Sequence, residues 1–117
     1  MSICRVLIIE DDDDTRESLA IALADAGFQV EQAADGRSVQ RRLGQGEKFD
    51  VALVDVHLPG PSCEEMIGRM QSEGIRVILV TGDTSARVLR LAQQAKLLRK
   101  PMALQDLEAA VKEACAA

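Results

Sequence analysis

The feature that most constrains the fold is an alternation of short apolar runs with segments of helical periodicity. The predicted strands are residues 5–9, 28–33, 50–55, 75–80 and 96–99, and the predicted helices are residues 14–26, 35–43, 62–71, 84–94 and 103–114. Strands that alternate with helices form a parallel sheet, covered on both faces and joined by right-handed crossovers. The pattern therefore predicts a doubly wound α/β fold.

The ends of the helices are indicated by capping residues. Asp14, with Glu17 three residues later, has the spacing of a capping box and is the expected N-cap of the first helix. Gly27 is expected to end that helix, and Asp35 to cap the second. The residues expected to face the core are Leu19, Ala22, Leu23 and Ala26 in the first helix and Leu104, Leu107 and Val111 in the last.

Composition narrows the class of protein and its partners. A length of 117 residues suits one domain, residues 1–117. A net charge of −5 argues against direct contact with nucleic acid or an anionic membrane, since both require a basic face. No apolar run approaches the ~20 residues of a membrane span.

The cysteines predict a reducing compartment. Cys4, Cys63 and Cys115 are odd in number and spaced too widely for a metal knuckle. We therefore expect no disulfide framework, a cytoplasmic location, and three cysteines that act as small buried or half-buried apolar side chains.

Polar residues follow the predicted strands. Glu10 and Asp11 follow the first strand, Asp55 ends the third, Thr81 follows the fourth and Lys100 follows the fifth. Ligands of open parallel sheets bind beyond the carboxyl ends of the strands. We therefore expect the three carboxylates, the hydroxyl and the ammonium at one edge of the sheet.

The stretch IIEDDDD, residues 8–14, places five carboxylates in a row. Two such charges ~4 Å apart repel by about 4 kcal/mol at an effective dielectric constant of ~20, so a positive charge must offset them. Carboxylate oxygens suit Mg²⁺, and Lys100 adds a second positive charge. Residues 12–14 are expected to turn outward, near the positive end of the helix dipole. Taken alone, the run is also compatible with a solvated helix start, but its spacing does not match an EF-hand.

Four motifs, in order, resemble the receiver (response regulator) domain of two-component signalling. They are VLIIEDD (6–12), DVALVDVHLPG (50–60), VILVTGDT (77–84) and LLRKP (97–101). The resemblance covers essentially the whole chain and implies a flavodoxin-like five-stranded sheet of order 2-1-3-4-5. The pairing of TGDT with LLRKPM is most similar to receivers attached to hybrid sensor histidine kinases.

The resemblance implies a phospho-accepting switch. Asp55 would be the nucleophile that takes a phosphoryl group from a phosphohistidine and forms an aspartyl phosphate. Thr81 and Lys100 would bind the phosphoryl oxygens, and the Lys100–Pro101 bond would be cis. The donor would be a sensor histidine kinase or a histidine phosphotransfer domain. Such a domain is no conventional enzyme, but it promotes its own phosphorylation and dephosphorylation.

The resemblance also implies a metal site and two tuning positions. Mg²⁺ or Mn²⁺ would be held by the carboxylates of Asp11 and Asp55 and the main-chain carbonyl of His57, with Glu10 acting through water. His57 and Asp83 would flank the attacking water and tune the lifetime of the phosphoryl group. A homodimer through the fourth and fifth helices is a further expectation.

Three alternatives stay open at this stage. A phosphatase of the haloacid dehalogenase type needs a second aspartate two residues after Asp55, where this chain has His57. A flavin carrier of the same architecture needs a phosphate loop, where this chain has EDDDD, and aromatic residues, of which the chain has only two. A degenerate receiver that serves only as an interaction module is suggested by Leu97, which stands where the family usually has an aromatic residue.

Overall fold

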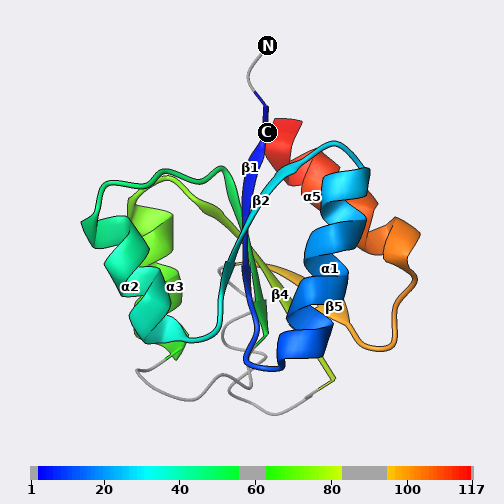
Figure 1. Ribbon diagram of the computed structural model, residues 1–117, viewed down its shortest axis with the longest axis horizontal. Helices are drawn as coiled ribbons and strands as arrows, with labels where there is room; N and C mark the ends of the chain where they lie inside the picture. The colour runs from blue at the N-terminus through cyan, green and yellow to red at the C-terminus, as the bar shows by residue number, and fades with distance from the viewer. Residues whose placement is uncertain (1–2, 56–62, 83–94, 117) are drawn as a thin grey trace.

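The computed structural model describes residues 3–55, 63–82 and 95–116 (Figure 1). The strands are β1 (Arg5–Ile9), β2 (Gln29–Ala33), β3 (Val51–Asp55), β4 (Arg76–Thr81) and β5 (Lys96–Arg99). The helices are α1 (Asp13–Asp25), α2 (Gly36–Gly44), α3 (Cys63–Ser72) and α5 (Leu104–Ala116). All neighbouring strands pair in parallel, in the order β2-β1-β3-β4-β5, so the predicted fold and strand order are confirmed. The predicted helix 84–94 lies outside the described residues.

The sheet is buried between two helical layers. Helices α2 and α3 lie on one face, and α1 and α5 lie on the other (Figure 1). Because side chains alternate along a strand, Leu7 and Ile9 pack in the cluster with α2 and α3, whereas Val6 and Ile8 pack with α1 and α5. Every residue of β3 is buried, as expected for a central strand covered on both faces. No helix among the described residues is long and apolar enough to cross a bilayer.

The N-cap of α1 differs from the prediction. The cap is Asp12, whose carboxylate accepts hydrogen bonds from the Thr15 amide (2.8 Å) and the Thr15 hydroxyl (2.6 Å). Asp14 was the wrong choice because a cap must have extended backbone, and Asp14 already lies in the first helical turn. These hydrogen bonds hold the pKa of Asp12 below its usual value.

The other two predicted capping residues, Asp35 and Gly27, are confirmed. Asp35 caps α2 by accepting a hydrogen bond from the Ser38 amide at 2.8 Å, and this bond lowers the pKa of Asp35. Gly27 follows the C-cap of α1 with a φ of +103°, a backbone conformation that favours glycine.

The buried faces of α1 and α5 match the prediction only in part. Leu23, Leu107 and Val111 are buried, and Leu19 and Ala22 are half-buried. Ala26 is exposed because it is the C-cap, where helical periodicity has ended. Leu104 is 46% exposed because it is the first residue of α5, whose buried face begins one turn later.

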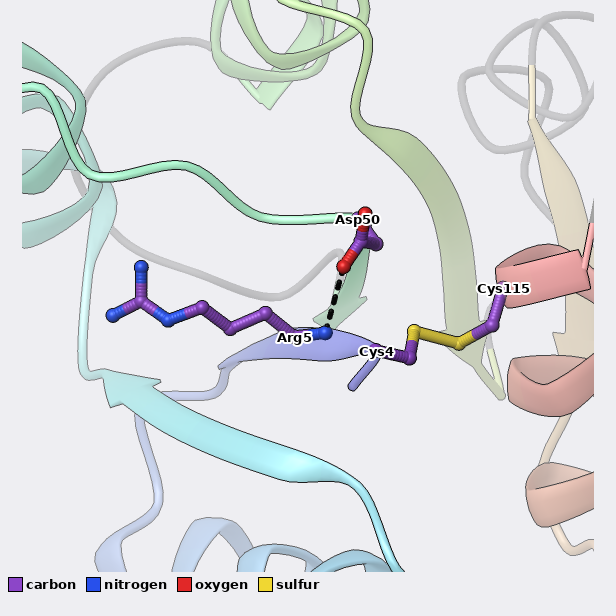
Figure 2. Close-up of a disulfide and its surroundings, with 4 residues drawn as sticks. All are labelled: Cys4, Arg5, Asp50 and Cys115. Atoms are coloured by element: carbon purple, nitrogen blue, oxygen red, sulfur yellow. Dashed lines mark hydrogen bonds between the residues drawn. A yellow bond between two sulfur atoms is a disulfide. The ribbon is translucent and has the colours of Figure 1, made fainter. Parts of the chain in front are cut away.

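A disulfide joins Cys4, just before β1, to Cys115 in the last turn of α5 (Figure 2). The expectation of no disulfide was therefore wrong. The two residues are 111 positions apart in the sequence, but the fold brings their Cα atoms to 5.9 Å, which is normal disulfide geometry. Sequence spacing could not reveal this pairing, because it depends on where the first strand and the last helix meet. Cys63 lies outside the disulfide and is buried, as expected.

Candidate functional site

The strand register brings four polar residues to one edge of the sheet. Asp55, the last residue of β3, pairs with Val80 on β4, and Thr81 follows directly. Thr81 pairs in turn with Arg99 on β5, so Lys100 follows at the same edge. The amide of Lys100 donates to the Thr81 carbonyl at 2.9 Å, which continues the ladder by one residue. Glu10 follows β1 beside β3.

An ion pair in the site joins Asp55 to Lys100. The ammonium Nζ of Lys100 lies 3.0 Å from Oδ2 of Asp55. The Asp55 side chain is 9% exposed, whereas that of Lys100 is 41% exposed. A nearly buried carboxylate requires a partner of opposite charge, and Lys100 provides it from the solvent side. The bond between Lys100 and Pro101 is cis, as predicted.

Glu10 is buried against the same carboxylate. Burial, followed by the hydrogen bond and negative charge of Asp55, raises the pKa of Glu10 to about 7, and Lys100 offsets part of this effect. The Glu10 carboxylate also accepts a hydrogen bond from the Asp11 amide at 3.0 Å. At neutral pH the site therefore holds more carboxylate than one ammonium can balance, so it favours an added cation.

The donor chemistry fits a hard divalent cation. Glu10 and Asp55 offer carboxylate oxygens within one cluster, and Asp11 follows directly in the chain. Among residues 3–55, 63–82 and 95–116, no group of three acidic, histidine or cysteine side chains is arranged to hold a metal. Mg²⁺ needs no such group, since it is commonly bound by one or two carboxylates and keeps several waters. The expected ligand His57 and the tuning position Asp83 lie outside the described residues.

A small cavity of about 90 Å³ opens beside these groups. Glu10, Asp55 and Lys100 line it together with apolar side chains that include Ile8, Leu53 and Met102. An apolar wall lowers the local dielectric constant and strengthens each charge interaction in the site. The aliphatic side chain of Leu97, three residues before Lys100 on β5, is half-buried and packs against the cluster of α2 and α3.

The last three acids of the IIEDDDD stretch lie at the exposed start of α1. Asp12 and Asp13 are exposed; Asp12 caps α1, and Asp13 forms an ion pair with Arg16 at 2.6 Å. The same guanidinium donates to the main-chain carbonyl of Glu10 at 2.8 Å. Arg16 therefore offsets one negative charge of the acidic turn and contacts the backbone at Glu10. Sequence reasoning missed this role, although the spacing of three residues from Asp13 was a usable signal.

Replacing Glu10 with glutamine is expected to stabilise the metal-free protein, and increasingly so as the pH rises. A glutamate normally has a pKa of 4.5, and the folded-state pKa of Glu10 is about 7. The stability it contributes is fully present below pH 4.5 and is lost as the pH rises through about 7. Between pH 5.5 and pH 8 the advantage of Glu10→Gln should grow by about 2 kcal/mol.

Urea unfolding at the two pH values measures this change. Glu17→Gln is the matched control, since Glu17 is exposed on α1. If Glu10→Gln raises the free energy of unfolding equally at both pH values, the pKa of Glu10 is not raised by burial as the structure implies.

Comparison with known proteins agrees with this geometry. Residues 6–112 match the family described as response regulator receiver domain. The response regulator receiver protein CpdR of Brucella abortus is 32% identical over 108 residues, which cover 88% of this chain and 89% of CpdR. A CheY-like receiver domain from Methanospirillum hungatei superposes with a TM-score of 0.88 at 28% identity, covering 98% of this chain and 95% of the other.

Other relatives are much longer proteins. A cyclic di-GMP phosphodiesterase of Thermotoga maritima is 35% identical over 107 residues, which make up 87% of this chain but 28% of that protein. The CAI-1 autoinducer sensor kinase/phosphatase CqsS of Vibrio cholerae is 32% identical over 94 residues, or 76% of this chain and 14% of CqsS. The match over residues 6–112, together with the likeness to CpdR over nearly its whole length, shows that this chain belongs to the response regulator receiver domain family of two-component systems.

Proposed function

We propose that this chain works as a phospho-accepting switch in which Asp55 takes a phosphoryl group from a phosphohistidine. The observation that carries the proposal is the contact of 3.0 Å between Lys100 Nζ and Asp55 Oδ2, next to the buried Glu10 carboxyl. Lys100 places a positive charge beside the Asp55 carboxylate, whose side chain is only 9% exposed. The donor is a sensor histidine kinase or a histidine phosphotransfer domain, as membership of the family supports.

Residues of this chain can carry out the steps of the proposed phosphoryl transfer. An Asp55 oxygen attacks phosphorus, the bond from phosphorus to the donor imidazole breaks, and the imidazole keeps the electron pair. Lys100 then moves its charge from the carboxylate to a phosphoryl oxygen, and the Thr81 hydroxyl donates to another. Both groups stabilise charge where it develops on the transferring group. Hydrolysis later restores the Asp55 carboxylate and releases phosphate.

The metal proposed for this site is Mg²⁺, with Mn²⁺ as a substitute. Asp11 and Asp55 would hold it directly and Glu10 would act through water, with the His57 carbonyl as the remaining predicted ligand. When bound, it neutralises charge on the phosphoryl oxygens. The raised pKa of Glu10 supports this assignment, since a site that lacks positive charge gains most from a cation. Tuning of the phosphoryl lifetime by His57 and Asp83 stays a prediction.

A second candidate function is a degenerate receiver that acts only by binding a partner. Leu97 favours it, because this aliphatic side chain packs against the core where the family usually has an aromatic residue. The predicted homodimer through the fourth and fifth helices involves residues 84–94 and stays a prediction.

The test is incubation with Mg²⁺ and acetyl phosphate, followed by intact-mass analysis. The parent protein should gain one phosphoryl group and Asp55→Asn should gain none. Asp50→Asn is the matched control, since Asp50 is exposed just before the amino end of the same strand. A folded parent protein that gains no mass would favour the degenerate receiver, and a gain by Asp55→Asn would contradict the assignment of the acceptor.

A further inference from the structure

We propose that Cys4 and Cys115 form a reversible thiol–disulfide site whose oxidation state decides whether the last turn of α5 is anchored to the sheet. The site lies at the end of the sheet opposite the carboxylate cluster, because Cys4 precedes β1 whereas Glu10 follows it. It is therefore separate from the phosphoryl chemistry, and it holds whether or not Asp55 is an acceptor.

Cys4 is held firmly without the disulfide. Its carbonyl accepts a hydrogen bond from the Gln29 amide at 3.0 Å, which ties it to β2. The next residue, Arg5, is tied to Asp50, which directly precedes β3. Its amide donates to Oδ2 of Asp50 at 2.8 Å (Figure 2). Its carbonyl accepts from the Asp50 amide, also at 2.8 Å. Breaking the disulfide leaves all of these bonds in place, so the beginning of β1 should not move.

Cys115 has weaker support, which is the partial packing of Ala114 and Cys115 against the apolar cluster of α1 and α5. The buried residues of α5 end at Val111; Lys112 and Glu113 are exposed, and Ala114 and Cys115 are half-buried. The last turn of a helix also has carbonyls without intrahelical partners, so it frays readily when nothing holds it. The disulfide thus connects an anchored strand to a weakly held helix end, and its loss should act on the helix alone.

Reduction of the disulfide between Cys4 and Cys115 requires an external dithiol. Both cysteines are half-buried, so a reagent can reach the bond. One thiolate of the dithiol attacks a sulfur of the disulfide, which forms a mixed disulfide and releases the other cysteine as a thiolate. The second thiol of the reagent then displaces the bound cysteine. The products are two cysteine thiols and an oxidised dithiol, a transfer of two electrons and two protons that an oxidised dithiol reverses.

The experiment compares hydrogen exchange and thiol content in oxidised and reduced protein, with dithiothreitol as the probe. Under denaturing alkylation, oxidised protein should label one of its three cysteines and reduced protein all three, and reoxidation should restore the first pattern. On reduction, exchange of the amides of residues 112–116 should accelerate by about tenfold or more through local fraying, whereas residues 5–9 should stay protected and exchange only through global unfolding.

Two variants complete the design. Cys115→Ser should show the fast exchange at residues 112–116 with or without dithiothreitol, and Cys63→Ala should respond as the parent protein does. Labelling of all three cysteines before reduction would overturn the proposal, and so would equal exchange of the helix end in both states. Exchange of the β1 amides as fast as in an unfolded chain would also overturn it, because reduction would then unfold the domain rather than release α5.

Discussion

Replacing Lys100 with alanine is expected to slow phosphoryl acceptance from acetyl phosphate by about 100- to 1,000-fold, the usual effect of losing one preorganised charge in a transition state. Its Nζ lies 3.0 Å from the Asp55 carboxylate. Without it, the Asp55 carboxylate loses the positive charge 3.0 Å away and keeps the Glu10 carboxyl beside it. The developing charge on the phosphoryl oxygens also loses a partner.

Initial rates at saturating Mg²⁺ measure this effect by intact mass. Lys96→Ala is the matched control, since Lys96 is exposed at the beginning of the same short strand. It should accept phosphoryl groups at the parental rate. A Lys100→Ala protein that is folded and equally fast would show that the contact with Asp55 is only a surface ion pair.

Replacing Cys4 and Cys115 together with serine is expected to lower the free energy of unfolding by about 4 kcal/mol under oxidising conditions. The disulfide spans 111 positions, nearly the whole chain, and closing so long a loop restricts the unfolded state strongly. The folded state should be little changed, because Arg5, Asp50 and Gln29 keep the first strand in place.

Urea unfolding with and without dithiothreitol measures this loss. Reduced parent protein should match the double serine variant, and the variant should not respond to the reductant. If oxidised and reduced parent proteins unfold at the same urea concentration, the disulfide does not contribute to stability as the structure implies.

Periodicity was sufficient for most of the fold because each strand and helix is specified locally. The boundaries predicted for the first and last strands, residues 5–9 and 96–99, match β1 and β5. Local pattern was insufficient where several equivalent residues compete. With four aspartates in a row, the choice of Asp12 as the cap depends on the Thr15 hydroxyl, which adds a second hydrogen bond. The disulfide could not be predicted from the sequence, because it depends on a tertiary contact between the first strand and the last helix.

The residues of the candidate site could be predicted because they follow the ends of locally specified strands. Parallel strands of known order place Asp55, Thr81 and Lys100 at one edge, whatever the loops do. The raised pKa of Glu10 could not be predicted, because it arises from burial beside Asp55 rather than from residue type. The contact of Arg16 with the Glu10 carbonyl likewise depends on how α1 follows the strand.

Peptide mapping after incubation with acetyl phosphate, with Mg²⁺ in one arm and a chelator in the other, tests the central claim most directly. The account predicts one added phosphoryl group on the peptide that contains Asp55, present with Mg²⁺ and absent with the chelator. A phosphoryl group mapped to another residue, or equal labelling of Asp55 without a divalent metal, would contradict it.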